Sequence, residues 1–419
     1  MLSIDHYDSF THSFEEKEYS GQKWGLDRIE HVLEKLGSPH KKFPSIHIGG
    51  TNGKGSTAAL VAAVLRRSGY RVGLYTSPHL EDFCERIIIN GERIVPDRVM
   101  ELARMIGQTE TEEPEGLTFF EYATAMAFLY FASEKIDIAV VEVGLGGRLD
   151  ATNVLTPLVS AVTSIGKDHT ALLGTHLEDI ACEKAGIIKK NIPFVLGSFG
   201  FLPDGVLEVF RERASAQGAP FIPLIQNLIP PDVRLGLAGD HQIRNANTAL
   251  GILTVLREVY GWRLEASAIW EGFRSVQWPG RLETLSTRPC VLLDGAHNPD
   301  AMIVLCDYLK TFLQGRRLKV LFGAMRDKDT ASLIRLLKPL AAEWSFTAPV
   351  VSRAARPEEL QSLASGLEVK SRVFASTASA LEKWVSTLED DEVLLVTGSL
   401  MLVGEARTWW TKHASSGGI

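Results

Sequence analysis

Residues 136–143, IDIAVVEV, constrain the fold most strongly. The run is apolar at nearly every position up to Glu142, which is typical of a strand buried on both faces of a parallel sheet. Short apolar runs of this kind alternate with helical patterns from residue 45 to the end. The sequence therefore predicts an α/β protein with right-handed βαβ units and a mainly parallel sheet.

Two series of such elements follow one another along the chain. The first has predicted strands at 45–48, 71–75, 159–164 and 194–196, with predicted helices at 56–68 and 120–133. A second series begins after the turn residues WPGR at 278–281. It has predicted strands at 290–294, 318–322, 344–346 and 392–397, and predicted helices at 299–313, 330–337, 357–364 and 377–387. We expect two domains, residues 1–284 and a smaller α/β domain at 289–419.

The bulk composition excludes several classes of protein. Apolar residues make up 45% and charged residues 23% of the 419 residues, as in ordinary globular chains. A formal charge of −7 argues against general binding to nucleic acid. The acidic first twenty residues lack the apolar core of a signal peptide, and no apolar run is long enough to span a bilayer. The expected location is the cytoplasm, with no membrane partner.

The glycine-rich stretch GGTNGKGS at 49–56 stands between a predicted strand and a predicted helix. It departs from the pattern G-x-x-x-x-G-K-[ST], because Gly55 follows Lys54 and the hydroxyl residue comes only at Ser56. The amides of such a loop and the positive end of the helix can still converge on a phosphate. The alternative is a tight turn with an exposed lysine.

Polar residues also follow other predicted strands, at the sheet edge where α/β proteins bind ligands. Glu142 interrupts a buried strand and needs an ion pair or a metal, with Mg²⁺ the natural partner of a carboxylate beside a phosphate loop. Asp168 and His169 follow the strand at 159–164, although a lone histidine is commonly a core or surface group. Lys184 lies on a predicted short helix, where a solvated lysine is the ordinary interpretation.

The loop 144–150, GLGGRLD, lacks the G-x-G-x-x-G spacing of a dinucleotide site and is instead expected to place Arg148 and Asp150 over the site. In the second domain DGAHNP, at 294–299, ends the first predicted strand. Asp294 there can accept from a ribose hydroxyl or anchor the turn, His297 lies beside it, and Arg281 can reach a phosphate.

Taken together, these motifs resemble the folylpolyglutamate synthase/dihydrofolate synthase family, a branch of the Mur ligases. The resemblance covers nearly the whole chain. The matching motifs, in chain order, are GTNGKGS, SPHL (77–80), ERI (85–87), GLGGRLDATN (144–153), DH (168–169), EKAGIIK (183–189), GDHQIRNA (239–246), PGR (279–281) and DGAHNP. The resemblance implies a P-loop ATPase domain of the Mur ligase type followed by a smaller Rossmann-like domain. The loop RLDATN is similar to that of the bifunctional bacterial enzymes.

The resemblance also implies roles for individual residues. The nucleotide would be held by Gly50, Thr51, Asn52, Gly53, Lys54, Gly55, Ser56, Asn245, Arg281, Asp294 and His297. One Mg²⁺ would be bound by Ser77 and Glu142, and a second would involve His169, with Lys184 carbamylated and therefore anionic. Lys54, His169 and Lys184 would serve catalysis. The pterin pocket would be lined by Phe83, Arg86, Phe120, Arg148 and Asp150.

The activity implied is an ADP-forming amide ligase that needs ATP and two Mg²⁺ ions. It would join L-glutamate to dihydropteroate, giving dihydrofolate, and to the γ-carboxylate of tetrahydrofolates, through an acyl phosphate. We expect a monomer. Two alternatives remain open: a synthase limited to polyglutamylation, and a P-loop nucleotide switch that binds ATP to control a partner.

Overall fold

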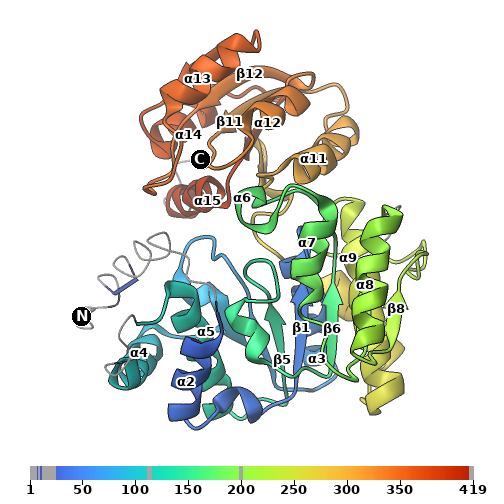
Figure 1. Cartoon of the computed structure of the whole chain (residues 1–419). Helices are drawn as coiled ribbons and strands as arrows, with labels where there is room; N and C mark the ends of the chain where they lie inside the picture. The colour runs from blue at the N-terminus through green and yellow to red at the C-terminus, as the bar shows by residue number, and fades with distance from the viewer. Residues whose placement is uncertain (1–6, 8–9, 12–24, 111–115, 198–201, 415–419) are drawn as a thin grey trace. The chain divides into compact units, whose positions relative to one another are not determined.

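The structure is a computed structural model that describes residues 7, 10–11, 25–110, 116–197 and 202–414 (Figure 1). The chain forms two compact units. Unit 1 comprises Met1–Gly236 and Gln242–Gln277, and unit 2 comprises Leu237–His241 and Trp278–Ile419. The division expected between residues 284 and 289 cuts strand β9 (Glu283–Thr287), which pairs with β10 (Cys290–Asp294) in unit 2. Unit 2 therefore begins upstream of that division.

An eight-stranded sheet forms the centre of unit 1, in the order β4-β3-β2-β5-β1-β6-β7-β8. Its strands are β1 (Ser45–Gly49), β2 (Val72–Tyr75), β3 (Ile87–Ile89), β4 (Glu92–Arg93), β5 (Ile138–Glu142), β6 (Val159–Val162), β7 (Phe194–Leu196) and β8 (Phe221–Pro223). All neighbours are parallel except β3 and β4, which continue one edge as an antiparallel extension. The predicted α/β class and mainly parallel sheet are confirmed.

Strands β1 and β5 are adjacent at the middle of this sheet, and every residue of both is buried. Ile48 of β1 is in register with Glu142 of β5, and Gly49 with Val162 of β6. Parallel strands in this register end at one edge of the sheet. The phosphate loop and the segments that follow β5 and β6 therefore leave the sheet at the same place.

Helices cover both faces of the unit 1 sheet and connect its strands (Figure 1). They are α2 (Asp27–Lys35), α3 (Lys54–Arg67), α4 (Pro96–Glu110), α5 (Phe119–Ser133), α6 (Thr170–Leu173), α7 (Leu177–Ala185), α8 (Asp204–Ala216), α9 (His241–Tyr260) and α10 (Ala266–Ser275). Three short 3₁₀ helices are η1 (Pro39–Lys41), η2 (Phe83–Arg86) and η3 (Ala151–Val154). Helix α5 begins with a capping box between Thr118 and Glu121, which fixes where Phe119 and Phe120 start the helix.

Unit 2 has a six-stranded sheet of its own, in the order β13-β12-β11-β14-β10-β9. Besides β9 and β10 its strands are β11 (Arg317–Phe322), β12 (Ala341–Phe346), β13 (Ser371–Val373) and β14 (Glu392–Thr397). Its helices are α11 (Pro299–Phe312), α12 (Thr330–Leu337), α13 (Pro357–Gly366), α14 (Thr377–Val385) and α15 (Leu400–Ala414). Only β9 runs antiparallel to its neighbour. This unit is the smaller parallel α/β domain that the sequence predicts.

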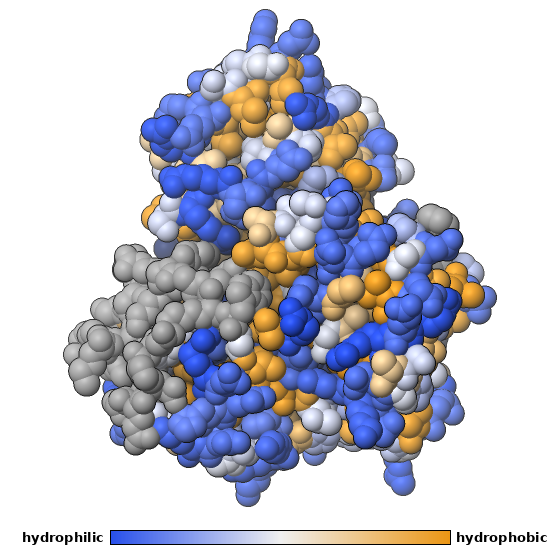
Figure 2. Space-filling model, in the orientation of Figure 1, coloured by the Kyte–Doolittle hydropathy of each residue, from blue (hydrophilic) through white to orange (hydrophobic). Residues whose placement is uncertain are grey.

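On the face drawn in Figure 2, hydrophilic side chains predominate on each unit, and apolar side chains form smaller patches among the hydrophilic ones. Within the described residues, no helix is both long and apolar enough to cross a membrane.

Candidate functional site

The phosphate loop joins β1 to α3, which begins at Lys54 with Gly55 and Ser56 in its first turn. Gly50 has φ +141° and Gly53 has φ +84°, backbone conformations that favour glycine. A Cβ on Gly50 would lie 2.0 Å from Thr163 Oγ1. The first amides of a helix have no partner within it, and this end carries partial positive charge. The loop therefore has the geometry of an anion site despite its departure from the common pattern.

The segment that follows β6 holds the phosphate loop in place. Ser164 accepts a hydrogen bond from the Thr51 amide (2.8 Å) at its carbonyl and from the Asn52 amide (2.9 Å) at its hydroxyl. Thr163 Oγ1 donates to the Asn52 carbonyl (2.7 Å), and the Gly166 amide donates to Thr51 Oγ1 (3.0 Å). The strand predicted over 159–164 ends at Val162. Residues 163–166 therefore lie beyond the end of the strand, and sequence reasoning missed their role beside the loop.

Two lysines meet at one carbonyl of the phosphate loop. Lys54 Nζ donates to the carbonyls of Gly50 and Thr51, both at 3.1 Å, and Lys184 Nζ donates to the same Gly50 carbonyl at 3.0 Å. Lys184 is only 4% exposed. Burial, and then the charge of Lys54, lower the pKa of Lys184 to about 7, against the opposing effects of Asp168 and Asp150. The structure thus buries Lys184 beside the loop, and a solvated lysine is excluded.

Asn245 of α9 also touches the phosphate loop. A Cβ on Gly53 would lie 2.1 Å from Asn245 Oδ1, so the amide group packs directly on the loop backbone. Asn245 Nδ2 donates to Gln242 Oε1 at 2.8 Å, which fixes its orientation. The predicted nucleotide residue of α9 is therefore brought to the predicted phosphate loop within unit 1.

The remaining predicted nucleotide residues form a group within unit 2. Asp294, the last residue of β10, accepts from the amides of Leu282 (3.0 Å) and Ala296 (2.9 Å). Burial raises its pKa, while nearby Arg281 opposes that change. His297 Nδ1 lies 2.8 Å from the Gly295 carbonyl. Asp294 thus fixes the turn, and Arg281 and His297 lie on either side of it along the chain.

Glu142 and Ser77 meet where two adjacent strands end. Glu142 is the last residue of β5 and is 5% exposed, and Ser77 follows the neighbouring strand β2. The Ser77 amide donates to Glu142 Oε2 at 3.1 Å. A carboxylate and a hydroxyl are oxygen donors of the kind Mg²⁺ prefers, and Mg²⁺ commonly keeps several water ligands. The donors at this edge therefore fit the magnesium ion that the resemblance implies.

His169 lies beside Asp168 just before α6, in a left-handed conformation with φ +51°. Its amide donates to Asp168 Oδ1 at 2.9 Å, and its Nε2 is 3.9 Å from the same oxygen. Over the described ranges, no three His, Cys, Asp or Glu side chains gather as a metal-binding cluster. A second metal at His169 would accordingly need ligands other than a ready-made set of this type, such as a modified lysine or phosphate oxygens.

Three of the predicted pterin residues, Phe83, Arg86 and Phe120, lie around the start of α5. Phe83 and Arg86, both on η2, are almost fully buried. The Arg86 guanidinium lies 4.8 Å from the ring centre of Phe119, and its Nε donates to His79 Nδ1 at 2.9 Å. Phe120 is packed on the backbone of Gly144, where a Cβ would come within 2.5 Å of the ring. The rings of Phe83, Phe119 and Phe120, here called the aromatic wall, therefore lie beside the loop 144–150 together with the buried Arg86 guanidinium.

Arg148 and Asp150 lie in that loop but face different surroundings. Arg148 is exposed and pairs with Glu183 of α7 at 2.8 Å. Asp150 is buried, and its Oδ2 accepts from the Leu145 amide at 2.8 Å, while its Oδ1 accepts from the Thr152 amide at 3.0 Å. Burial raises the pKa of Asp150 against these hydrogen bonds. Asp150 thus closes the loop on itself, and Arg148 ties it to α7.

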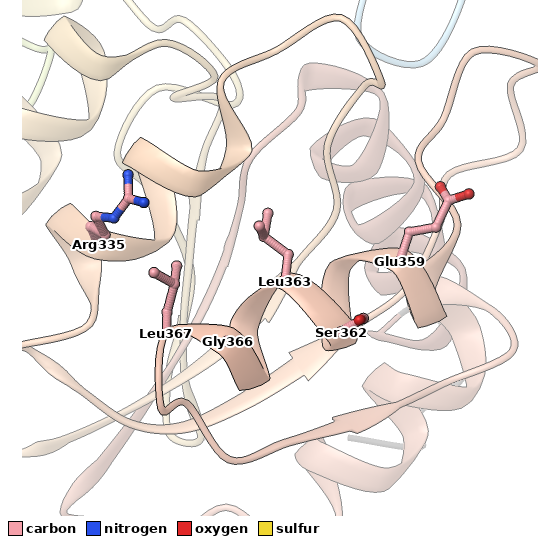
Figure 3. Close-up of a pocket in the computed structure, with 6 residues that line it drawn as sticks. All are labelled: Arg335, Glu359, Ser362, Leu363, Gly366 and Leu367. Carbon is pink, nitrogen blue, oxygen red and sulfur yellow. The ribbon is translucent and has the colours of Figure 1, made fainter.

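Unit 2 has a hollow whose lining includes none of the predicted site residues (Figure 3). It is formed by α12 and α13, and its lining residues are Arg335, Glu359, Ser362, Leu363, Gly366 and Leu367. The chemistry expected of the chain therefore has its best support at the edge of the unit 1 sheet.

Comparison with known proteins matches both units to one enzyme family. The Mur ligase middle domain matches residues 48–194, and the Mur ligase glutamate ligase domain matches residues 280–400. The Bacillus subtilis dihydrofolate synthase/folylpolyglutamate synthase is 35% identical, over 92% of this chain and 95% of that protein. A Haloferax volcanii protein named "Probable bifunctional folylpolyglutamate synthase/dihydropteroate synthase" is 36% identical, and the match spans only 49% of its length.

Solved structures agree with these matches. The Escherichia coli FolC protein in complex with DHPP and ADP has a TM-score of 0.88 at 29% identity, covering 98% of this chain and 99% of that chain. The Yersinia pestis bifunctional folylpolyglutamate synthase/dihydrofolate synthase complexed with AMPPNP and Mn ion has a TM-score of 0.85 at 29% identity. The match covers 99% of this chain and 98% of that one.

Proposed function

From the premise that this chain belongs to the dihydrofolate synthase/folylpolyglutamate synthase family of Mur ligases, we propose that it is an ATP-dependent, ADP-forming amide ligase. Its acceptors are dihydropteroate and the γ-carboxylate of reduced folates, and its donor is L-glutamate. The observation that carries this proposal is the phosphate loop with Lys54 at the head of α3, on the same sheet edge as the Ser77–Glu142 pair.

The reaction has two chemical steps. The acceptor carboxylate attacks the γ-phosphorus of ATP, ADP leaves, and an acyl phosphate forms. The glutamate amine then attacks the acyl carbon, loses a proton, and inorganic phosphate leaves as the amide forms. Both steps build negative charge on oxygen, so they need positioned positive charge and no protein nucleophile.

Residues of this chain supply that charge and the orientation. Lys54 exchanges its hydrogen bonds to the carbonyls of Gly50 and Thr51 for phosphate oxygens, and the amides of the loop bind the same phosphates. Ser77 and Glu142 would hold the magnesium ion, which neutralises phosphate charge when bound. Phe120, whose side chain is only partly buried, offers a ring on which the flat pterin can stack, and the buried Arg86–Phe119 pair supports this region from within.

Lys184 is a candidate for carbamylation, in which Nζ attacks CO₂ and loses a proton to become a carbamate. Its pKa of about 7 leaves a large neutral, nucleophilic fraction at neutral pH. The product would carry a negative charge beside Lys54, replacing the repulsion between two lysines by an attraction. A mass increment of one carbamate on the native protein supports this, and equal activity of wild type, Lys184→Glu and Lys184→Ala would contradict it.

The decisive experiment measures ADP release with Mg-ATP and L-glutamate, using dihydropteroate and tetrahydrofolate as separate acceptors. Both acceptors should stimulate release and gain one glutamate by mass spectrometry. Release with tetrahydrofolate alone would reduce the function to polyglutamylation. Slow hydrolysis that neither acceptor changes would favour a nucleotide switch.

The first prediction concerns Lys54. Lys54→Ala should lower kcat by about 10²–10³-fold with an unchanged melting temperature, because a charge-stabilising group is lost while the fold is kept. Lys190→Ala, which removes an exposed lysine of the same unit, is the matched control and should retain activity. Near-normal turnover in Lys54→Ala would overturn the loop assignment.

A further inference from the structure

A chain of buried polar groups runs from the middle of the unit 1 sheet to the loop 144–150. It begins at His47 in β1, passes through Thr152 on η3, and ends at Asp150. His47 Nε2 lies 2.8 Å from Thr152 Oγ1, and Thr152 Oγ1 donates to Asp150 Oδ1. His47 and Thr152 are fully buried, and Asp150 is 5% exposed. Burying polar groups in a core costs free energy unless they are hydrogen-bonded, so a buried series of this kind suggests a role for them.

The hydrogen bonds along this chain have one consistent direction. The Asp150 carboxylate accepts from two backbone amides, those of Leu145 and Thr152, and from the Thr152 hydroxyl. A threonine hydroxyl has a single proton to donate. Because that proton is given to Asp150, the Thr152 oxygen must accept from His47, whose Nε2 therefore carries the proton. Burial lowers the pKa of His47 to about 3, so the imidazole stays neutral and keeps this tautomer at neutral pH.

The loop at the end of this chain is packed against two site elements. Its Gly144 backbone touches the ring of Phe120 on α5. Its Arg148 amide donates to the Glu183 carbonyl of α7 at 2.8 Å, one residue before Lys184. A change in the orientation of Asp150 would therefore move a loop that lies between the aromatic wall and the buried lysine.

We propose that His47 is a positioning residue for the acceptor site: its Nε2–H sets the Thr152 hydroxyl, which holds Asp150 and the loop 144–150 in the conformation that binds the acceptor. This role rests on the proposed function, because it presupposes that the acceptor binds in the region of Phe120 and Arg86. It assigns a task in binding to a residue that touches neither nucleotide nor acceptor.

The test compares two pairs of variants in the full-length enzyme. His47→Gln keeps a donor near the position of Nε2, and His47→Leu removes it. Thr152→Ser keeps the hydroxyl, and the isosteric Thr152→Val removes it. His40→Leu is the control. His40 is another buried histidine of unit 1 with a lowered pKa, but it does not take part in the hydrogen bonds between His47, Thr152 and Asp150.

We expect His47→Leu and Thr152→Val to raise KM for dihydropteroate by about tenfold, the equivalent of one buried hydrogen bond, while KM for ATP changes less than about twofold. His47→Gln and Thr152→Ser should stay within about threefold of wild type. The double variant His47→Leu/Thr152→Val should be no worse than either single variant, because both break the same chain.

Three results would overturn the proposal: an unchanged KM for dihydropteroate in both disrupting variants, an equal rise in KM for ATP, or the same effect in His40→Leu. If His47→Leu fails to fold, the Thr152→Val and Thr152→Ser pair decides alone. Nitrogen-15 chemical shifts of the unliganded protein give a readout independent of activity. His47 should be the Nε2–H tautomer, and any other tautomer would refute the proposed direction of the hydrogen bonds from His47 through Thr152 to Asp150.

Different results would refute the proposed function itself. If wild type uses only tetrahydrofolate, dihydrofolate synthesis is refuted, and the same variants are then judged on KM for tetrahydrofolate. If wild type uses neither acceptor, the ligase function and this positioning role fall together, even where the tautomer is as expected.

Discussion

His47 has no exposed surface, so its protonation is linked to folding. Its pKa lies at about 3 in the folded chain, lowered by burial and then by the charge of Lys189, whereas an ordinary histidine titrates at 6.5. Between these values the unfolded chain binds a proton that the folded chain excludes. Stability contributed by this site is therefore complete above pH 6.5 and is lost as the pH falls toward 3.

At the residue scale we predict that the free energy of unfolding of His47→Gln falls less steeply with decreasing pH than that of the wild-type protein. Below pH 6 the wild-type protein should lose about 1.4 kcal/mol more per pH unit than the variant. Urea unfolding at pH 7.5, 6 and 5 measures the difference. Comparing the two proteins cancels the titration of Asp150, whose raised pKa acts in the opposite direction. The two slopes should coincide above pH 7.5, and coincidence at pH 5 as well would contradict the prediction.

At the scale of one element, the phosphate loop depends on glycine for both backbone conformation and space. Gly50→Ala should weaken ATP binding by more than about tenfold and destabilise unit 1 by about 2–3 kcal/mol, because the Cβ would meet Thr163 and the backbone would be strained. Calorimetry with an ATP analogue and urea unfolding measure these effects.

Gly69→Ala is the matched control for that prediction. Gly69 also has positive φ, at +90°, but no atom lies within 4 Å of the position of its Cβ. It should cost about 1 kcal/mol of stability and leave ATP binding unchanged. An equal loss of binding in both variants would mean that general destabilisation, and not the loop, controls nucleotide affinity.

Some elements could be predicted from the sequence to the residue. Strands β7, β10 and β14 and helix α12 occupy the predicted ranges, since each is a compact apolar run between turn residues. Short strands at the sheet edges, such as β4 with two exposed residues and β9 with its partly exposed pattern, were not predictable in this way. Their stability comes from pairing with a neighbour and not from their own composition.

The candidate site likewise has some features that could be predicted from local sequence and others that depend on tertiary contacts. Lys54 and Glu142 could be placed from local patterns, a glycine loop before a helix and an acid that ends a buried strand. The hydrogen bonds of Thr163 and Ser164 to the phosphate loop join residues more than 110 positions apart. The burial of Lys184 likewise depends on how α7 packs in unit 1. Neither feature has a signal in the neighbouring sequence.

At the scale of the whole molecule, each unit has its own core, and unit 2 places an ion pair inside that core. Lys319 of β11 lies 2.7 Å from Glu392 of β14, with side-chain exposures of 8% and 2%, and its Nζ is 4.8 Å from the ring centre of Trp384. Lys319→Met should destabilise unit 2 by about 2–3 kcal/mol, because among the described residues Glu392 then keeps only Arg317, whose side chain is 50% exposed, as a cationic partner.

Lys310→Met provides the comparison within unit 2. Lys310 and Asp307 are equally close, at 2.7 Å, but each side chain is 63% exposed. Exposed pairs contribute about 0–1 kcal/mol, so this change should scarcely shift the urea midpoint. A Lys319→Met midpoint as high as that of Lys310→Met would show that the buried pair adds nothing to stability.

Strand β1 links the two segments that we propose to bind the nucleotide and the acceptor. His47 is hydrogen-bonded to Thr152, next to the loop 144–150, and two residues later the same strand leads into the phosphate loop at Gly49. Inserting or deleting one residue here would turn His47 to the other face and displace the loop by about 3.3 Å. A change in the length of β1 would therefore disturb both segments at once, whereas a substitution that keeps its length would act only on the contacts of the residue that it replaces.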